Sequence, residues 1–260
     1  MNSVMIRHRA VALLLGAAAL ASCEKNAVQD ITGSLPASQV RFFNFGVNAP
    51  SVNFYANNTK MTATSSATGT EATTGVNYGL VGANGLYSGL EPGPYTFSGR
   101  IAATTDKDLP ISNVQASVAA GKKYSFYQSG FYNSTTKTVD AFIVEDDFID
   151  EFAYDVAYVR FVNAISNANP MSLTATGTVD SLPRAIGGTV AYKAAGPFVA
   201  IPGGSYDLVT RYAGSTTPVI TRAAVSFSRG RIYTITAFGD ITVTSSTATN
   251  RARLDNTVNR

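Results

Sequence analysis

The stretch VRFFNF at residues 40–45 recurs as VRFVNA at residues 159–164, which begins 119 residues further along the chain. Both copies are dominated by β-branched and aromatic residues, a composition that is typical of β-strands. A proline follows each copy at a similar distance, Pro50 in the first and Pro170 in the second. This recurrence indicates that most of the chain consists of two copies of one folding plan.

Two further pairs of landmarks recur in the same order. The run LEPGPY at residues 90–95 corresponds to AIPGGSY at 200–206, and GKKYSF at 121–126 corresponds to GRIYTI at 230–235. A repeat of this length has the size of a whole domain, because the units of solenoid proteins are only about 20 to 50 residues long. The sequence therefore predicts two domains and a connector: repeat 1 at residues 38–148, an acidic linker at residues 149–155, and repeat 2 at residues 156–260.

Within each repeat, apolar and polar residues alternate with period two, which predicts strands that bury one face. In repeat 1 the predicted strands cover residues 39–45, 52–56, 85–90, 94–102, 111–118, 123–130 and 139–145. Repeat 1 carries about ten additional residues, which we place in the loop-like Thr, Ser, Ala and Gly stretch at 61–75. No helical period follows Ala21. The sequence therefore predicts an all-β fold of two tandem antiparallel β-sandwiches after an N-terminal signal peptide helix.

The N-terminus has the pattern of a secretory signal peptide. Arg7, His8 and Arg9 supply positive charge, and residues 10–21 form a run of twelve residues that is apolar apart from Gly16. A run of that length fits a signal peptide and is too short to span a bilayer. We expect residues 1–22 to be removed and residues 23–37, which are polar, to act as a flexible tether.

The apolar run ends in LASC at residues 20–23, which resembles the lipobox of bacterial lipoproteins. Cys23 is the only cysteine of the chain, and the resemblance makes it the lipid attachment site. The alternative is a plain secretory peptide with an incidental cysteine. In lipoprotein sorting, Glu24 in place of an aspartate after the cysteine favours delivery to the outer membrane, on either its periplasmic or its outer side.

The composition excludes several classes of chemistry. His8 is the only histidine and leaves with the signal peptide, so the mature chain has no imidazole for a catalytic triad or a zinc site. Loss of Arg7 and Arg9 lowers the formal net charge from +3 to +1, which argues against a nucleic-acid partner. With Cys23 at the cleavage point, no thiol is left for a disulfide or a nucleophile. We therefore expect a protein that is not an enzyme.

Several runs in repeat 1 resemble the bacterial domain-of-unknown-function (DUF) 4397 family. These runs are VRFFN at residues 40–44, NAPSVNFY at 48–55, PGPY at 92–95, AGKKY at 120–124 and EDD at 145–147. Repeat 2 is more divergent, since NANP at residues 167–170 replaces the NAP run. The resemblance implies an immunoglobulin-like or transthyretin-like sandwich in the cell envelope, and it implies no activity.

Six acidic residues gather at the junction of the repeats, at positions 145, 146, 147, 150, 151 and 155. Oxygen ligands at a domain boundary could hold Ca²⁺, with Glu145, Asp146, Asp147 and Asp150 as the candidate ligands, although the spacing is not that of an EF-hand loop. No other cofactor is expected. The alternative is a solvated acidic linker in which Asp146 or Asp147 pairs with an arginine.

Arg41 and Arg160 occupy equivalent positions in the two copies, and Asn44 and Asn163 recur near the ends of the same strands. The arginines could bind an anion. We favour a structural role for all four residues, with the arginine stems over apolar neighbours and the amides bonded to turn backbone.

The sequence thus predicts a lipid-anchored cell-envelope protein that acts as a non-enzymatic binding, adhesion or structural module. Its expected partners are the membrane, through the anchor, and an envelope glycan or protein. One alternative is a carboxylate-dependent hydrolase of envelope polysaccharide or peptide, which needs two facing acids across a cleft. The other is a spacer that calcium makes rigid.

Overall fold

A computed structural model describes residues 38–62, 74–148 and 152–259. Across these residues the chain is built from strands and contains no α-helix, apart from a short 3-10 segment at Gly82–Gly85. Several predictions lie outside the described residues: the signal peptide, the tether, Cys23, Asp150 and most of the additional loop of repeat 1. No helix in the described part is long and apolar enough to cross a membrane.

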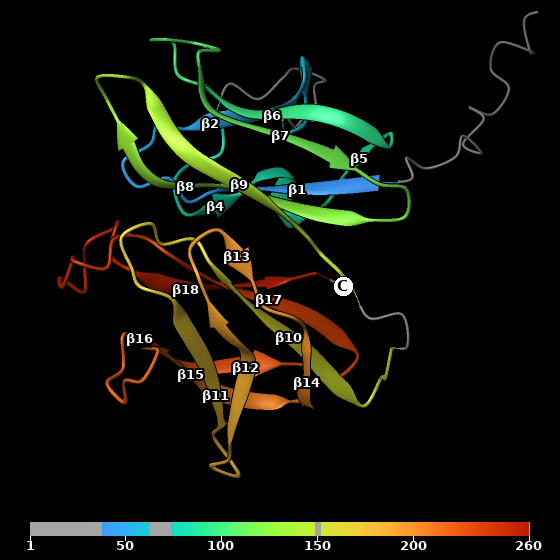
Figure 1. Ribbon diagram of the computed structural model, residues 1–260, viewed down its shortest axis with the longest axis vertical. Helices are drawn as coiled ribbons and strands as arrows, with labels where there is room; N and C mark the ends of the chain where they lie inside the picture. Colours follow the sequence, from blue (N-terminus) through green and yellow to red (C-terminus); the bar gives the residue numbers. More distant parts are fainter. Residues whose placement is uncertain (1–37, 63–73, 149–151, 260) are drawn as a thin grey trace, which may run out of the picture. The chain divides into compact units, whose positions relative to one another are not determined.

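Repeat 1 forms a sandwich of two sheets (Figure 1). The larger sheet contains β4 (Leu80–Val81), β1 (Ser38–Asn44), β8 (Lys123–Asn133) and β9 (Thr138–Glu145) in that order, with β5 (Ser88–Leu90) also paired to β1. The smaller sheet contains β3 (Thr59–Lys60), β2 (Val52–Ala56), β6 (Gly93–Ile101) and β7 (Pro110–Val118).

Repeat 2 has the same plan. Its larger sheet contains β13 (Ala194–Ala195), β10 (Val156–Asn163), β17 (Arg231–Phe238) and β18 (Arg253–Val258), with β14 (Val199–Pro202) also paired to β10. Its smaller sheet contains β12 (Pro183–Val190), β11 (Met171–Gly177), β15 (Gly204–Tyr212) and β16 (Ile220–Phe227). The prediction of an all-β, sandwich-like fold is confirmed.

One strand pair in each larger sheet departs from the antiparallel pattern. β1 runs parallel to β8, with Arg41 opposite Ser125, and β10 runs parallel to β17, with Arg160 opposite Thr234. Parallel neighbours cannot be joined by a hairpin, so they come from distant parts of the chain. The other pairs of named strands are antiparallel. The parallel pairs could not be predicted, because the alternation of residues along one strand does not indicate which distant strand lies beside it.

Each sandwich has its own apolar core. The core of repeat 1 is aromatic, with Phe42 packed against three other phenylalanine rings at centroid distances of 5.4, 6.2 and 5.8 Å: Phe54, Phe97 and Phe126. The core of repeat 2 is mainly aliphatic and includes Leu173, Ile186, Leu208 and Ile235. These side chains come from alternate positions of facing strands, as period-two patterning requires.

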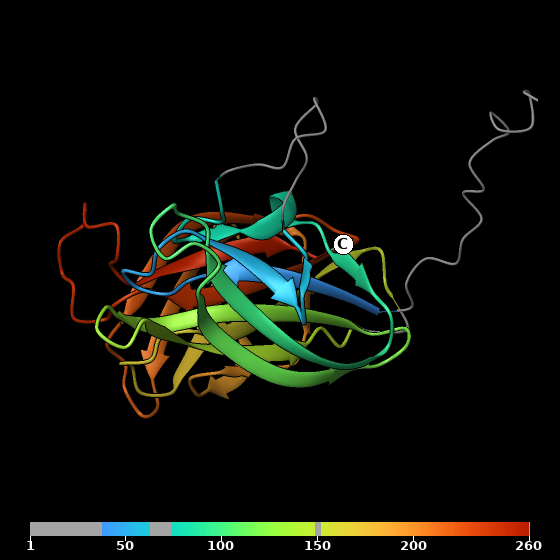
Figure 2. The same cartoon turned by 90° about the horizontal axis from the view of Figure 1, so that it is seen from above.

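A third apolar cluster packs the larger sheets of the two repeats against each other. Its members come from both repeats: Phe43, Phe45, Tyr127, Phe142, Val162, Ala164 and Phe238. Figure 1 shows the four sheets in layers, with the two larger sheets in the middle, and Figure 2 looks onto repeat 1 from above. Residues 36–260 accordingly form one compact unit. Because β1 buries both of its faces, the consecutive residues Phe42 and Phe43 are both in apolar clusters.

The turns that precede β8 and β17 are equivalent in the two repeats. Gly121 and Gly230 have φ values of 76° and 69°, in the left-handed region that glycine adopts without strain. Both glycines belong to the GKKYSF and GRIYTI landmarks, so their recurrence follows from the backbone geometry of this turn.

Candidate functional site

Arg41 and Arg160 point away from their own sandwich cores and into the space between the repeats. Their exposed fractions are only 3% and 2%. A buried guanidinium requires acceptors for its donors, because burying an unpaired charge costs several kcal/mol. The partners of these two arginines therefore define the chemistry of this region.

Arg160 has a partner for each nitrogen of its guanidinium. Nη2 donates to Asp146 Oδ1, Nη1 donates to the Glu145 carbonyl oxygen at 2.9 Å, and Nε donates to Thr234 Oγ1 at 3.0 Å. The Phe198 ring lies 4.8 Å from Cζ and covers one face of the guanidinium. The ion pair links repeat 2 to the end of the last strand of repeat 1.

Arg41 makes the corresponding contact in the opposite direction. Its Nη1 donates to Asn259 Oδ1 at 3.0 Å, and its Cζ lies 4.1 Å from the centroid of the Tyr87 ring. Arg41 Nε has no hydrogen-bond partner among the described residues. Arg41 is thus held by an amide and an aromatic ring, whereas Arg160 is held by a carboxylate.

The carboxylate of Asp146 is saturated by donors from both repeats. Besides Arg160, its Oδ2 accepts from Ser125 Oγ at 2.8 Å and from the Tyr87 hydroxyl at 2.6 Å. Burial and the negative charge of Asp146 raise the pKa of Tyr87 above its ordinary value. These hydrogen bonds hold the Asp146 side chain in one orientation, and both of its carboxylate oxygens accept bonds from protein groups.

The two recurring asparagines bond to backbone close to their strand ends. Asn44 Nδ2 donates to the carbonyl oxygens of Pro50 and Val76, at 3.3 and 2.8 Å. Asn163 Nδ2 donates to the Val190 carbonyl at 3.2 Å, and its Oδ1 accepts from a backbone N–H two residues later. Both side chains are completely buried, so these bonds hold the loops that follow β1 and β10.

The described members of the acidic cluster point to different partners. Glu145 and Asp147 lie 2.8 and 3.6 Å from Lys122 Nζ, while Asp146 is turned inward to Arg160. Among the residues that the structure describes, no group of three or more Asp, Glu, His or Cys side chains is arranged to hold a metal ion. The fourth candidate calcium ligand, Asp150, lies outside those residues.

Glu145 and Asp147 also line a hollow of ≈ 330 Å³ at the edge of this region, together with Arg160 and residues 195–198. A hydrolase would need one of these carboxyl groups as a general acid and the other as a base or nucleophile. Both carboxylates contact the same cation, Lys122 Nζ, and the Arg160 guanidinium lines the hollow beside them.

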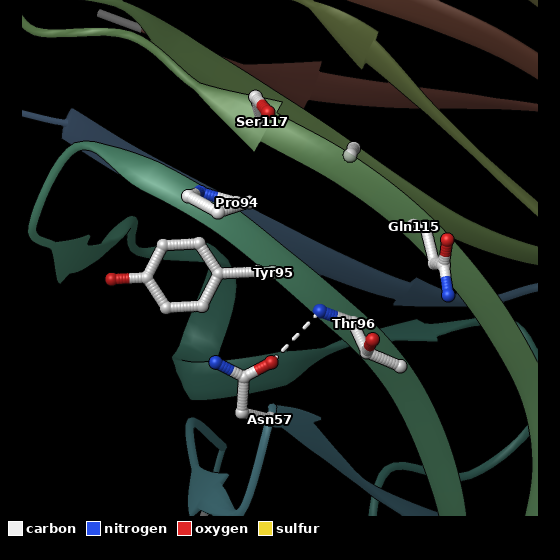
Figure 3. A pocket seen from close by; sticks show the side chains of 7 residues that line it. Asn57, Pro94, Tyr95, Thr96, Gln115 and Ser117 are labelled. Carbon is white, nitrogen blue, oxygen red and sulfur yellow. Dashed lines mark hydrogen bonds between the residues drawn. The ribbon is translucent and has the colours of Figure 1, made fainter.

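A second and larger hollow, of ≈ 420 Å³, lies on repeat 1 where β2 stops at Ala56 but its neighbour β6 continues (Figure 3). Its lining residues carry no formal charge: Asn57, Pro94, Tyr95, Thr96, Gln115, Ala116 and Ser117. Asn57 is held in place by two bonds to Thr96, one through its Oδ1 at 2.9 Å and one through its backbone N–H at 2.8 Å.

Several polar groups in this larger hollow have no hydrogen-bond partner among the described residues. In the part of the chain that the structure describes, neither the Gln115 amide nor the Ser117 hydroxyl makes a hydrogen bond, and both residues are exposed. Asn57 uses its Oδ1 for Thr96, and its Nδ2 makes no hydrogen bond to another described residue (Figure 3). Tyr95 presents half-buried ring surface, and its hydroxyl donates to the Glu91 carbonyl. The hollow therefore offers uncharged donors and acceptors beside an aromatic ring.

Sequence reasoning did not single out most of the residues that surround the arginines or the larger hollow. Ser125, Thr234 and Asn259 are ordinary strand-end residues in the sequence. The alignment of GKKYSF with GRIYTI shows that Ser125 and Thr234 occupy equivalent positions, and this recurrence is the signal in the sequence that could have identified them. No equivalent signal marks Gln115 or Ser117.

No curated protein matches the chain. The family described as a domain of unknown function (DUF4397) matches residues 38–174, which is more than half of the chain and includes repeat 1, β10 and most of β11. The match contains Arg41, Asp146 and Arg160, and thus the ion pair between the repeats. The chain therefore belongs to the DUF4397 family.

Proposed function

We propose that this protein is a lipid-anchored, non-enzymatic module of the bacterial cell envelope that binds a neutral glycan on repeat 1. The observation that carries the proposal is the uncharged hollow between β6 and the end of β2, with free amide and hydroxyl groups at Gln115 and Ser117. These groups match the hydroxyls of a sugar, each of which both donates and accepts hydrogen bonds.

The lining also favours a neutral glycan over a charged ligand. Phosphate and carboxylate ligands are bound through arginine or lysine, and neither residue type lines this hollow. The Tyr95 ring and Pro94 supply apolar surface for the C–H faces of a sugar ring. Because the hollow is shallow and lies on a strand edge, it suits part of an extended polysaccharide rather than an enclosed small molecule.

The sequence supports attachment to a membrane. Cys23 follows an apolar run of signal-peptide length and has the lipobox residues before it. Each buried CH₂ of an acyl chain contributes about 0.8 kcal/mol to membrane binding, so several chains hold a protein on the surface. Glu24 favours the outer membrane as the destination.

A role without catalysis is supported by the chemistry that remains after the signal peptide. The mature chain has no histidine, and Cys23 is its only cysteine. The carboxylates of Glu145, Asp146 and Asp147 contact Lys122 or Arg160. In enzymes, a general base or a nucleophile is a side chain that is free to contact the substrate. These three carboxylates are instead bonded to cationic side chains of the protein itself.

The proposal is tested by glycan binding to a soluble form that starts after Cys23. We expect binding to neutral envelope polysaccharides on a glycan array, with affinity measured by calorimetry. Gln115→Ala and Ser117→Ala should each weaken binding by about tenfold, the effect of one or two lost hydrogen bonds. Asn113→Ala is the matched control, because Asn113 is exposed on the same strand but does not line the hollow. Absence of glycan binding, or binding that both variants leave unchanged, would contradict the proposal.

A further inference from the structure

The two repeats contribute equivalent residues to the region between them. Strand register makes Arg41 equivalent to Arg160 and Ser125 equivalent to Thr234, because each arginine lies opposite its partner in a parallel pair. Asp146 and Asn259 are equivalent as well, since each directly follows the last strand of its repeat. The backbone N–H of Asp146 donates to the Lys123 carbonyl oxygen, and that of Asn259 donates to the Ile232 carbonyl oxygen. Lys123 and Ile232 occupy the same place in the GKKYSF and GRIYTI landmarks. The paired strands also make Tyr87 equivalent to Phe198.

The contacts between these residues are reciprocal. Arg160 of repeat 2 reaches Asp146 of repeat 1, and Arg41 of repeat 1 reaches the equivalent Asn259 of repeat 2. Each arginine lies over the aromatic ring of its own repeat, Tyr87 for Arg41 and Phe198 for Arg160. Asp146 and Asn259, which accept from the arginines, are each also bonded to a hydroxyl of their own repeat. Ser125 Oγ donates to Asp146 at 2.8 Å, and Asn259 Nδ2 donates to Thr234 Oγ1 at 2.7 Å.

An exchange in which residue i contacts j and the equivalent of j contacts the equivalent of i is the signature of a two-fold interface between like subunits. We infer that the facing larger sheets are a dimer interface between two like domains, now carried on one chain, and that repeats 1 and 2 hold each other through the reciprocal arginines without needing the linker. The partner that this surface of repeat 1 fits is the second domain of the same fold.

The apolar part of the interface shows why repeat 1 fits repeat 2 better than a second copy of itself. At equivalent positions, repeat 1 has Phe43, Phe45 and Tyr127 where repeat 2 has Val162, Ala164 and Thr236. At these positions large rings of repeat 1 therefore meet small side chains of repeat 2, while Phe238 of repeat 2 stacks on Phe45. Two copies of repeat 1 would place large rings against large rings.

The polar part has diverged in the same direction. Repeat 1 provides a carboxylate with a tyrosine hydroxyl beside it, while repeat 2 provides an amide and a phenylalanine at the equivalent places, Asn259 and Phe198. Of the two arginines, Arg160 has a carboxylate partner, Asp146, and Arg41 has an amide partner, Asn259. This asymmetry makes the pairing of repeat 1 with repeat 2 specific.

The inference is tested by cutting the chain after it has folded. A protease site is inserted between Tyr154 and Asp155, which are both exposed, and the purified full chain is cleaved there. We expect the two fragments to remain together during gel filtration at micromolar concentration, with a mass equal to that of the uncut chain. Fragments that separate on cleavage, whether folded or unfolded, would overturn the inference.

Variants then show whether the arginines hold the fragments together. Arg160→Met and Arg41→Met in the cleaved protein should each raise the dissociation constant of the fragments at least about tenfold. Arg231→Met is the matched control, because Arg231 is an exposed arginine on β17 that makes no side-chain hydrogen bond, ion pair or ring contact with the described residues of repeat 1. If all three variants dissociate alike, the reciprocal arginines are not what joins the repeats. This test is independent of the proposed glycan site, since the hollow shares no residue with the interface.

Discussion

Phe45, which directly follows β1, and Phe238 of β17 stack across the two repeats, with ring centroids 4.1 Å apart and ring planes 13° apart. Both rings are almost completely buried, although neither belongs to the core of its own sandwich. Burial of two aromatic rings in one contact makes the interface a substantial source of stability.

Replacement of Phe45 by alanine should therefore destabilise the whole protein. The expected loss in the free energy of unfolding is about 3 kcal/mol, from lost apolar burial and the cavity that remains. Urea denaturation followed by circular dichroism measures it. Leu86→Ala is the control, because Leu86 is 68% exposed and its truncation should change the free energy by less than about 0.5 kcal/mol. Equal effects of the two variants would show that the stack contributes nothing.

A gain in stability is expected from Asn259→Asp. The new carboxylate would give Arg41 the charged partner that Arg160 already has in Asp146, while the Thr234 hydroxyl can donate to it. We expect an increase of about 1 kcal/mol at pH 7, which disappears below about pH 4 as the carboxyl group is protonated. Urea titrations at the two pH values measure it, with the exposed Asn113→Asp as control. A loss of stability at pH 7 would contradict this account of Arg41.

Alkaline pH should unfold the protein through its buried tyrosines. Burial raises the pKa of Tyr78 to about 12 and also raises the pKa values of Tyr87 and Tyr127. In the unfolded chain tyrosine loses its proton near pH 10, so above that pH deprotonation favours the unfolded state. Each such tyrosine should add no pH dependence well below pH 10, and above it should lower the free energy of unfolding by about 1.4 kcal/mol per pH unit until its folded-state pKa is passed.

Tyr87→Phe separates one of these contributions. The variant should be less stable at pH 7 by about 1 to 2 kcal/mol, since Asp146 loses a donor, and its decline between pH 10 and pH 12 should be shallower than that of the wild type. Tyr154→Phe, at a position 73% exposed, is the matched control. An unchanged alkaline decline in Tyr87→Phe would mean that the Tyr87 hydroxyl of the wild type loses its proton at the same pH in the folded and unfolded states.

Cys23→Ser should release the protein from membranes without unfolding it. The substitution removes the sulfur that the lipobox prediction makes the attachment point, and Cys23 precedes the first described strand. Fractionation of cells, followed by circular dichroism of the soluble protein, measures both effects. A variant that stays in the membrane fraction would show that another segment holds the protein there.

Most of the strands could be predicted from the sequence, because each sandwich strand buries one face and alternates accordingly. The two-residue strands β3 and β4 were missed, since two residues carry no period. The contact between the repeats was also missed. In β1 the neighbours Phe42 and Phe43 make both faces of the strand apolar, and a single strand does not reveal whether its second buried face meets its own domain or another.

The candidate site residues were predictable to different degrees. Recurrence alone drew attention to Arg41 and Arg160, and the pairing of Asp146 with an arginine was among the sequence-based alternatives and is present. Asn259 could not be found, because an asparagine near a chain end has no distinguishing pattern. The hollow at Gln115 arises because β2 ends at Ala56, opposite Phe97, so that residues 93–96 of β6 lie beyond its end. This arrangement depends on register rather than on composition.

The central claim is that Arg160, a residue of repeat 2, stabilises repeat 1 through Asp146. Amide hydrogen exchange of β8 and β9, measured by mass spectrometry in the intact chain, tests it most directly. In Arg160→Met, protection of these repeat 1 strands should fall at least about tenfold relative to the wild type, because Asp146 is left buried without its cation. Protection of β8 and β9 that matches the wild type and the Arg231→Met control would contradict the claim.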